Sequence, residues 1–589
     1  MPHTDRRPCR TLCVSDLNPP TARPALPGRV AAITSGLLAG VAALATGELA
    51  SGLVADWQSP VVSVAEAVID AVPRSVKEFA IETFGENDKI ALVVGILVFS
   101  TIFAMLLGLL GRRRPGVPVV GFAAFACVGV WASQRFPGSS LSSIIPSVLA
   151  GVAGAGTFLL LRRLAAPAGG TQPVNAQLND LLNDNLLNDN LLNDNDQPSG
   201  NEQLLDDGLS ADDGLSAGPA AMAAATPTMT MINGASSRRR FLVVSGAVAA
   251  AAAIAATAGR ALRSRFDASA SRNAVVLPEA ADPLPIAPST IAVDSPDVSP
   301  FYTPNGEFYR VDTALVVPQV PADDWVLTVT GMVDTPLRLS YADLLARNLV
   351  EEDITLTCVS NTVGGKLVGT ARWLGLPLRE LLDEAGVQAG ADQIVGRSVD
   401  GYTGGFPVDA AYDRPALIAV AMNGEPLPID HGFPARLMVP GLYGYVSATK
   451  WLSEIELTRF DDFDQYWVRR GWDREAPIKT MARIDTPRSL GKIAAGQFVI
   501  GGVAWAQTIG ISMVEVAIDD GPFVEADLAD DWSEHTWRQW SLAWDATPGR
   551  HRLTVRATDA NGKLQTDQRA EPFPNGASGW MSIFVDVKS

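Results

Sequence analysis

The sequence predicts a membrane protein in which N-terminal transmembrane α-helices precede a soluble α+β domain and a C-terminal, immunoglobulin-like β-sandwich. Three observations predict this order. Residues 1–165 are very rich in Ala, Val, Leu and Gly, whereas the region after residue 290 holds most of the tryptophans and both signs of charge. Near the C-terminus, short apolar runs alternate with turn residues. At 589 residues, the chain is also too long for a single domain.

Four apolar stretches in residues 1–165 are long enough to cross a bilayer. They are Val30–Ala55, Ile90–Leu110, Val117–Ser133 and Leu141–Leu164. Arginines precede the first stretch, separate the second from the third and follow the fourth, while acidic residues fill the loop between the first and second. Because positive charge favours the cytoplasmic side, the N-terminus and the end of the fourth span are both predicted to lie inside the cell.

Glu48 is the one charged residue inside the first predicted span. An intramembrane carboxylate is often functional, but near a helix end it can simply reach the membrane interface. The four spans contain no histidine, which excludes a bis-histidine haem held within them by this chain.

Residues 166–236 are predicted to form a disordered, low-complexity linker. The five-residue unit Leu181–Asn185 occurs three times in succession there, and this period fits neither a helix nor a strand. A calcium-binding Asp/Asn repeat is the alternative, although the glycine turns and ligand spacing of calcium loops are missing.

Residues 237–260 resemble a twin-arginine export signal. The order Ser-Arg-Arg-x-Phe-Leu begins at Ser237, with the arginine pair at Arg238 and Arg239, and an apolar run follows. A plain stop-transfer helix with positive flanks is the alternative. If the segment stays as a fifth span, the C-terminal part of the chain lies outside the cytoplasm. This export route carries folded proteins, which suits a cofactor that is inserted in the cytoplasm.

Cys358 is the one cysteine after residue 260. It cannot form an internal disulfide, and an unpaired thiol outside the cytoplasm is a liability unless something binds it. It ends an apolar, strand-like run at the start of a loop. A soft thiolate is an appropriate metal ligand, so Cys358 is a candidate ligand; a small buried apolar residue in a strand is the alternative.

Two soluble regions follow the export signal. Residues 295–475 mix strand-like runs with short helices, and Leu378–Ala385 is predicted to be an amphipathic helix. Residues 483–589 show short alternating runs separated by turn dipeptides, which predicts an antiparallel β-sandwich. The predicted strands are Phe498–Ala504, Met513–Ile518, Trp537–Trp544, Arg552–Thr558 and Met581–Val587.

Five segments after residue 300 resemble the sulfite oxidase family of molybdopterin-dependent oxidoreductases. They are Phe308–Asp312, Cys358–Asn361, Tyr402–Pro407, the stretch from His431 to Trp451, and the sandwich beginning near Arg483. The fourth is the most specific, because its His, Arg and Lys-Trp keep the family's order and approximate spacing. The resemblance implies a molybdenum–molybdopterin cofactor and a sandwich that mediates a homodimer; packing of the sandwich within its own chain is the alternative.

The resemblance also implies a role for each matching residue. Cys358 would be the metal ligand, and Tyr402 a catalytic phenol that hydrogen-bonds at the metal and relays a proton. The implied cofactor-binding residues are Tyr309, Arg310, Asp312, Asn361, Thr403, His431, Arg436, Ala448, Thr449 and Lys450. Their chemistry agrees, since Arg436 and Lys450 suit a phosphate. The alternatives are structural: an ion pair for Arg436 and a loop cap for His431.

Three arginines that surround the substrate anion in sulfite-oxidising members are missing. Val311, Thr362-Val363 and Asn575-Gly576 occupy their positions in our alignment. Because a small dianion needs fixed cationic donors, the sequence supports the cofactor but argues against sulfite. Arg372 and Arg397 are the residues that could replace the missing charges.

The predicted protein is therefore an extracytoplasmic molybdenum oxidoreductase on a multi-pass membrane anchor, which transfers an oxygen atom to or from a small substrate. No haem or iron–sulfur cluster is expected in this chain, so electrons would pass to a separate redox protein such as a cytochrome. A reductase of a neutral oxide such as a sulfoxide, a non-catalytic scaffold, and a transporter built from the four spans are the alternatives. The formal net charge of −18 argues against nucleic-acid binding.

Overall fold

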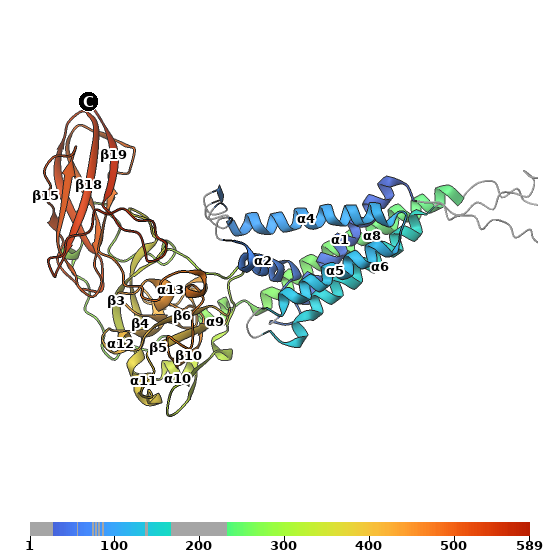
Figure 1. Cartoon of the computed structure of the whole chain (residues 1–589), viewed down its shortest axis with the longest axis horizontal. Helices are drawn as coiled ribbons and strands as arrows, with labels where there is room; N and C mark the ends of the chain where they lie inside the picture. Colours follow the sequence, from blue (N-terminus) through green and yellow to red (C-terminus); the bar gives the residue numbers. More distant parts are fainter. Residues whose placement is uncertain are drawn as a thin grey trace, which may run out of the picture. The chain divides into compact units, whose positions relative to one another are not determined.

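The computed structural model describes residues 27–55, 57–73, 76, 79, 83–84, 88–135, 139–166 and 233–589 (Figure 1). The predicted linker and its three repeats therefore lie outside the described residues, apart from the linker's two ends. The chain divides into two compact units. The first comprises Met1–Ala43, Val98–Ala124 and Gly151–Ala253, and the second comprises Leu44–Leu97, Phe125–Ala150 and Ile254–Ser589.

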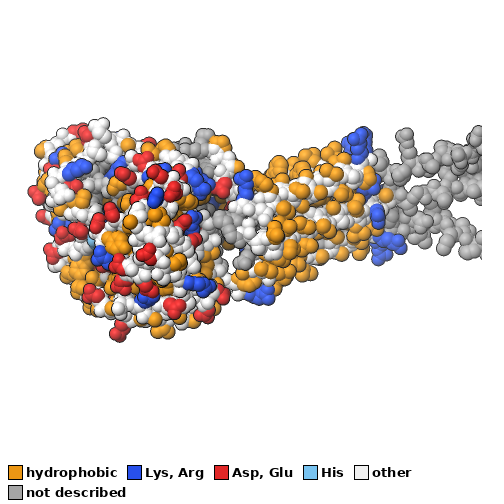
Figure 2. All heavy atoms as spheres, turned by 60° about the horizontal axis from the view of Figure 1, so that its bottom comes forward, with side chains coloured by type: hydrophobic (Ala, Val, Ile, Leu, Met, Phe, Trp, Pro, Cys, Tyr) orange, Lys and Arg blue, Asp and Glu red, His pale blue; other side chains and the backbone are white. Residues whose placement is uncertain are grey.

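Five helices among the described residues are long and apolar enough to cross a membrane. Their apolar side chains point outward: Val94, Phe99 and Ile102 are each more than half exposed, and Figure 2 shows apolar side chains covering these helices. Such a surface is stable in lipid rather than in water. The five are α1 (Arg29–Ser51), α4 (Asp88–Gly111), α5 (Gly116–Ser133), α6 (Ile145–Ala165) and α8 (Asn233–Arg263).

The first predicted span is too long, because α1 ends at Ser51 instead of Ala55. The chain turns at Gly52, whose Cα lies against the backbone of Gly259 in α8, where a Cβ would clash. It then enters the short helix α2 (Pro60–Ala71), which Ser59 caps by accepting a hydrogen bond from the Val61 amide at 3.2 Å. The Ser59 hydroxyl also donates to the Glu48 carboxylate, so this charge in the last turn of α1 has a polar partner.

Two sheets form the α+β domain. One has the strand order β2-β1-β10-β5-β6 and the other the order β3-β4-β7-β8, with β9 paired to β7. β1 and β10 run parallel, and the remaining pairs in these sheets are antiparallel. The strands are β1 (Val326–Gly331), β2 (Leu337–Ser340), β3 (Val350–Thr357), β4 (Val368–Pro377), β5 (Gln393–Ser398), β6 (Thr403–Pro407), β7 (Leu417–Met422), β8 (Glu425–Pro426), β9 (Arg436–Met438) and β10 (Leu452–Thr458).

Short helices connect these strands. The helices are α9 (Ser269–Ala274), α10 (Tyr341–Leu345), α11 (Leu378–Ala385), α12 (Asp409–Tyr412) and α13 (Gly444–Ser447). The 3₁₀ turns among the described residues are η2 (Leu141–Ile144), η3 (Ser264–Phe266), η4 (Ser289–Ile291), η5 (Ala322–Asp324), η6 (Ile429–His431) and η7 (Val468–Arg470). The prediction of a helix over Leu378–Ala385 is confirmed. Its four apolar residues are buried, and Gly386 ends it with φ of +71°.

One apolar core joins the two sheets of the α+β domain, with Val329 of β1 and Ile418 of β7 among its fully buried members. Ala268 also belongs to this core, and Arg272 donates to the carbonyls of Leu427 and Pro426 at 2.9 and 2.7 Å. The chain therefore packs against the α+β domain almost directly after α8 ends.

The C-terminal region consists of two further sheets, ordered β11-β13-β17-β16 and β12-β19-β18-β14-β15. Both contribute to one core, for example through Trp540 of β17 and Leu553 of β18. Each of the five predicted strands overlaps an observed one, while the immunoglobulin-like classification stays a prediction. The strands are β11 (Met481–Thr486), β12 (Gly491–Ala494), β13 (Gly496–Trp505), β14 (Ile511–Ile518), β15 (Val524–Glu525), β16 (Asp527–Leu528), β17 (Arg538–Ala546), β18 (Gly549–Asp559) and β19 (Met581–Lys588).

Candidate active site

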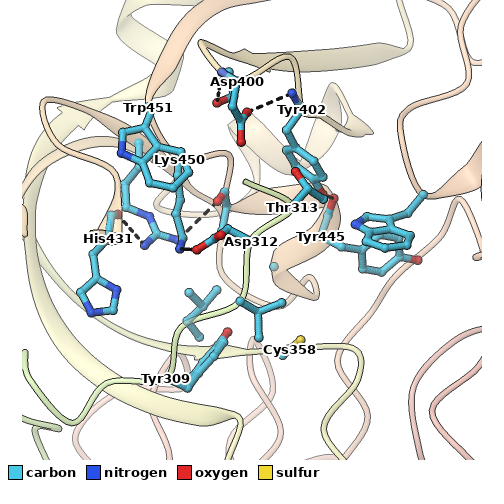
Figure 3. Close-up of a pocket in the computed structure, with 17 residues that line it drawn as sticks. Tyr309, Asp312, Thr313, Cys358, Asp400, Tyr402, His431, Tyr445, Lys450 and Trp451 are labelled. Carbon is cyan, nitrogen blue, oxygen red and sulfur yellow. Dashed lines mark hydrogen bonds and ion pairs between the residues drawn. The ribbon is translucent and has the colours of Figure 1, made fainter. Parts of the chain in front are cut away.

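A pocket in the α+β domain collects most of the residues that the sequence singled out. It encloses about 720 Å³ of empty space, counting the part open to solvent, which is the size range of small-molecule and cofactor sites. Figure 3 shows Tyr309 and Cys358 at one end and Asp400 at the other. The lining residues are Tyr309, Val311, Asp312, Thr313, Leu356, Cys358, Ser398, Asp400, Tyr402, His431, Arg436, Gly444, Tyr445, Ala448, Lys450, Trp451 and Trp467.

Cys358 is the first residue after β3 and is buried. The turn that follows fixes its backbone, because its amide donates to Leu367 and its carbonyl accepts from Asn361, both at 3.0 Å. Burial raises the pKa of the Cys358 thiol, an effect that hydrogen bonds from Ser360 partly oppose. Without a positive charge beside it the thiol stays protonated, and a metal ion would supply that charge.

Arg436, at the start of β9, is the most informative residue of the pocket. Its guanidinium is buried and donates to the backbone carbonyls of His431 at 3.0 Å and Ala448 at 3.3 Å. Its Nε has no hydrogen-bond partner, and no carboxylate among the described residues forms an ion pair with it. Burial lowers the pKa of Arg436 to about 10, so the group is still a cation at neutral pH. The Trp373 ring lies 5.2 Å from the guanidinium and stabilises the charge in part. A buried cation that has this aromatic contact but no carboxylate partner indicates a site for an anion.

Lys450 and Asp312 form a second charged group in the pocket. The Lys450 ammonium lies 3.2 Å from one carboxylate oxygen of Asp312 and 2.9 Å from the Asp430 carbonyl. Burial lowers the pKa of Lys450 to about 8, although Asp312 opposes that shift. For Asp312, burial alone would raise the pKa, but Lys450, Lys89 and Arg310 outweigh burial and lower it to about 2.

His431 is held as a neutral imidazole. Burial, then the nearby Arg436 charge, lower the pKa of His431 to about 4, and its Nε2 lies 3.3 Å from the Asn305 carbonyl. A neutral imidazole keeps one ring N–H that can donate and one nitrogen that can accept.

The hydroxyl of Tyr402 already has a hydrogen-bond partner. Tyr402 donates to the backbone carbonyl of Tyr445. Burial, then the Asp400 carboxylate, raise the pKa of Tyr402 well above its ordinary value, so the phenol stays neutral. Burial likewise raises the pKa of Asp400, whose oxygen accepts from the Tyr402 amide at 3.0 Å.

Four predicted cofactor-binding residues lie outside the pocket lining. Arg310 is partly exposed and pairs with Asp312 at 2.9 Å. The Asn361 amide oxygen accepts from Leu367 in the turn behind the cysteine, the Thr403 hydroxyl accepts from the Tyr466 amide, and Thr449 is buried against Gly396. Their assignment to the cofactor stays a prediction.

Several lining residues were not foreseen from the sequence. Asp400 and Trp467 come from two different loops and Tyr445 from α13, and no local pattern connects them. The Asp-Gly turn before Tyr402 is the one signal that could have drawn attention to Asp400.

The two arginines considered as replacements for the missing substrate ligands are used elsewhere. Arg372 forms two 3.0 Å contacts with Asp353, which is almost fully buried. Arg397 pairs with Glu456 and lies 3.7 Å from Glu454. Neither lines the pocket. Lys479 is the cation beside Asn575 and Gly576, and it too lies outside the lining.

The described residues contain no group of three or more His, Cys, Asp or Glu side chains that could hold a metal ion by themselves. A cofactor that carries its own metal ligands and an anionic group fits this pocket. Cys358 offers one soft ligand, and Arg436 offers the unpaired cation. Gly444 leaves room, since a Cβ there would meet nothing closer than 3.4 Å.

Comparison with known proteins agrees with this chemistry. Residues 314–467 match the family model described as "Oxidoreductase molybdopterin binding domain". The chain is 34% identical over 148 residues to the uncharacterized oxidoreductase YuiH of Bacillus subtilis, covering 25% of this chain and 72% of that protein. It is 27% identical over 317 residues to human mitochondrial sulfite oxidase, covering 45% of this chain and 58% of that protein. The chain thus spans less than two thirds of the length of the human relative.

A solved structure is similar as well. The sulfane dehydrogenase SoxCD from Paracoccus pantotrophus aligns with 50% of this chain and 83% of its own chain, at 22% identity and a TM-score of 0.44.

Proposed function

Because the chain belongs to the sulfite oxidase family of molybdopterin-dependent oxidoreductases, we propose that it is a membrane-anchored, extracytoplasmic enzyme that transfers an oxygen atom to or from a small substrate. The observation that carries the proposal is the pocket that joins Cys358 to the buried guanidinium of Arg436, which has no carboxylate partner among the described residues and an unsatisfied Nε. A structural arginine would have a carboxylate partner at this depth, since an unpaired buried charge is costly.

The residues of the pocket divide into three roles. Cys358 offers the thiolate ligand, Arg436 and Lys450 bind the anionic part of the cofactor, and His431 donates or accepts at its polar edge. When bound, the molybdenum cofactor supplies the two-electron oxygen-transfer chemistry. The protein positions it and excludes water with the buried walls Leu356 and Ala448.

Tyr402 and Asp400 are the proton-handling candidates. Burial is the main cause that raises the pKa of both groups, because it disfavours the charged form of each. To act on a substrate, the Tyr402 hydroxyl would have to leave the Tyr445 carbonyl, to which it donates. We infer that substrate entry and this exchange of partners are coupled.

The membrane part is proposed to anchor the enzyme with the catalytic domain on the extracytoplasmic side of the membrane. Support comes from five helices of sufficient length and apolarity, from the arginines at the cytoplasmic ends that the charge pattern predicts, and from exposed Arg238 and Arg239 at the start of α8. We infer that electrons are exchanged with a separate redox protein, since the sequence after residue 260 contains one cysteine and no cytochrome-like pair of histidines.

A reductase of a neutral oxide, such as a sulfoxide, is the second candidate. The pocket wall where sulfite-oxidising members carry arginine has Val311, and Trp467 and Tyr445 also line the pocket. Arg372 and Arg397 are held by carboxylates elsewhere. A wall of this kind suits an uncharged substrate better than a small dianion.

Metal analysis of the full chain in detergent tests the enzyme proposal. We expect about one molybdenum per chain, and we expect the Cys358→Ser variant to lose redox activity and most of its metal. Cys127→Ser, which replaces a free cysteine in α5, is the matched control and should retain both. If Cys358→Ser keeps its metal and activity, the proposed ligand is wrong; if the wild-type chain has no metal, the scaffold alternative is favoured.

A screen with an artificial electron donor and acceptor separates the two candidate reactions. Turnover of sulfite at micromolar concentration would contradict the argument from the missing arginines. Reduction of sulfoxides or amine oxides in preference to sulfite oxidation would support the second candidate.

A further inference from the structure

The segment from α2 to the first turn of α4 contacts the catalytic domain at two points, through residues that the structure describes. These are Asp70 in α2 and Lys89 in α4, and both belong to the same compact unit as the α+β domain. The segment lies outside residues 314–467, which the family model covers. Any role it has at the pocket is therefore additional to the cofactor fold.

Lys89 makes the first contact. Its ammonium lies 3.1 Å from a carboxylate oxygen of Asp312 and donates to the carbonyls of Asp312 at 3.2 Å and Ala314 at 2.7 Å. Asp312 lines the pocket and its side chain is 5% exposed. Lys89 therefore binds both the main chain and a side chain of the loop that lies before β1, at residues 312–314.

Asp70, in the last turn of α2, makes the second contact. One of its carboxylate oxygens accepts from the Tyr466 hydroxyl at 3.0 Å and from the Arg470 guanidinium at 2.8 Å. The same guanidinium lies 3.5 Å from the centre of the Tyr466 ring. Trp467, the next residue, lines the pocket.

These two contacts fall on two separate loops that line the pocket. Residues 309–313 contribute Tyr309, Val311 and Asp312 to the lining, and the loop at residues 466–470 contributes Trp467. The base of the segment is held as well, because Arg263 at the end of α8 donates to the Trp57 carbonyl at 3.3 Å. One segment of the membrane part thus holds two loops that have no strand pairing of their own.

We propose that this segment is a built-in clasp, in which Lys89 and Asp70 hold the two loops in place and so restrict access to Cys358. The proposal rests on the proposed function only in calling the pocket a cofactor pocket; the restriction of access is a property of the chain itself. It assigns the N-terminal membrane part a role in forming the site, in addition to anchoring it.

The rate at which a small maleimide labels Cys358 measures this access directly. The full chain would be prepared in detergent from cells that cannot make the cofactor, with Cys9, Cys13 and Cys127 replaced by Ser so that Cys358 is the one thiol. We expect Lys89→Ala and Asp70→Ala each to raise the labelling rate about three- to tenfold, the range expected when a partly exposed ion pair and its hydrogen bonds are lost.

Three controls keep the result interpretable. Lys89→Arg keeps the charge and should label almost as slowly as the parent, and Lys492→Ala removes an exposed lysine of β12 and should not change the rate. The paired exchange Asp70→Arg with Arg470→Asp should restore slow labelling if the ion pair acts as proposed. An equal thermal midpoint in all variants shows that they are folded.

An unchanged rate in the double variant Lys89→Ala/Asp70→Ala would overturn the clasp. That outcome would leave the enzyme proposal intact, since the labelling is done without cofactor and the metal content is measured on a separate preparation. Conversely, the preparation for metal analysis could contain no molybdenum while Lys89→Ala and Asp70→Ala still raise the labelling rate. That result would contradict the proposed function and support the clasp.

Discussion

The α+β domain and the C-terminal sandwich each bury an arginine, but the two arginines have different partners. In β11 of the sandwich, Arg483 pairs with Asp485 at 2.6 Å and donates to the Ser299 hydroxyl and the Gly365 carbonyl at 2.9 and 3.0 Å. In β9, Arg436 is as deeply buried, yet it has no ion-pair partner among the described residues and its Nε is unsatisfied. A buried charge is stable only when it is compensated, so the fold accounts for Arg483, while Arg436 requires a ligand.

The most direct test of this comparison is to remove the Arg436 cation from the pocket. We expect Arg436→Met to lower the bound molybdenum and the redox activity at least about a hundredfold, because a buried charge-assisted contact is lost. The free energy of unfolding of the cofactor-free chain should change by no more than about 2 kcal/mol. Relief from burying an unpaired charge offsets the two lost hydrogen bonds.

Metal analysis and thermal unfolding of the same preparations check both parts of that prediction. A large loss of stability without a loss of metal would make Arg436 a structural residue and remove the contrast with Arg483.

Removing the ion-pair partner of Arg483 in the sandwich should lower stability and leave the metal content unchanged. Asp485→Ala leaves Arg483 buried without its carboxylate, and breaking such a pair costs about 3–5 kcal/mol. We therefore expect a clearly lower unfolding midpoint in denaturant, with the molybdenum content of the folded fraction unchanged. Asp530→Ala is the matched control, because Asp530 is exposed. An equal midpoint for Asp485→Ala and the control would contradict the assignment of Arg483 to the fold.

Acid should destabilise the pocket before the cofactor is bound. The folded pKa of His431 is lowered to about 4 from 6.5, so between these values the unfolded chain binds a proton that the folded chain does not. This contribution to stability is fully present above pH 6.5 and is lost as the pH falls towards 4, by about 2–3 kcal/mol. Denaturant unfolding of the cofactor-free chain at pH 7 and pH 4.5 measures it.

His431→Gln should remove most of that pH dependence, whereas His551→Gln should not. The pKa of His551 is raised by its hydrogen bond to Asp519, although burial opposes this, so its contribution runs in the other direction. Equal pH dependence in wild type and His431→Gln would show that another group titrates.

The smallest predicted effect concerns substrate charge. Val311 lines the pocket and is 48% exposed, at a position where sulfite-oxidising members carry arginine by our alignment. We expect Val311→Arg to improve kcat/KM for sulfite about tenfold relative to a neutral oxide, since one charge-assisted hydrogen bond contributes roughly 1.5–3 kcal/mol. Val311→Leu is the uncharged control. No change in the ratio would place the substrate away from this wall.

Motif order singled out residues that the fold brings together in one pocket, because residues that flank strand ends lie close to one another; their roles stay predictions. Cys358, Tyr402, His431, Arg436 and Lys450 all line one pocket. Side-chain direction was harder to predict. Thr403 begins β6 and its hydroxyl accepts from the Tyr466 amide, so it lies outside the lining although its neighbour Tyr402 belongs to it. Thr449 likewise lies outside the lining, against Gly396.

Contacts between distant segments could not be predicted in the same way. Trp467 lies in a loop and Lys89 in the first turn of α4, and both reach the pocket region only through tertiary packing; neither lies in a motif. The helices were easier, since length and apolarity define them; the error at Ala55 arose because apolar residues continue past the turn at Gly52. The amphipathic period likewise predicted both ends of α11 correctly, and Gly386 ends the helix.

The position of β10 in its sheet constrains the order of events in the cell. β10 is the central strand of β2-β1-β10-β5-β6, and its partners β1 and β5 are made much earlier. A nascent chain that stops short of Leu452 has two separate strand pairs and no common sheet. This sheet can therefore form only after Thr458 has been synthesised, so any group that the domain encloses must enter it after that point.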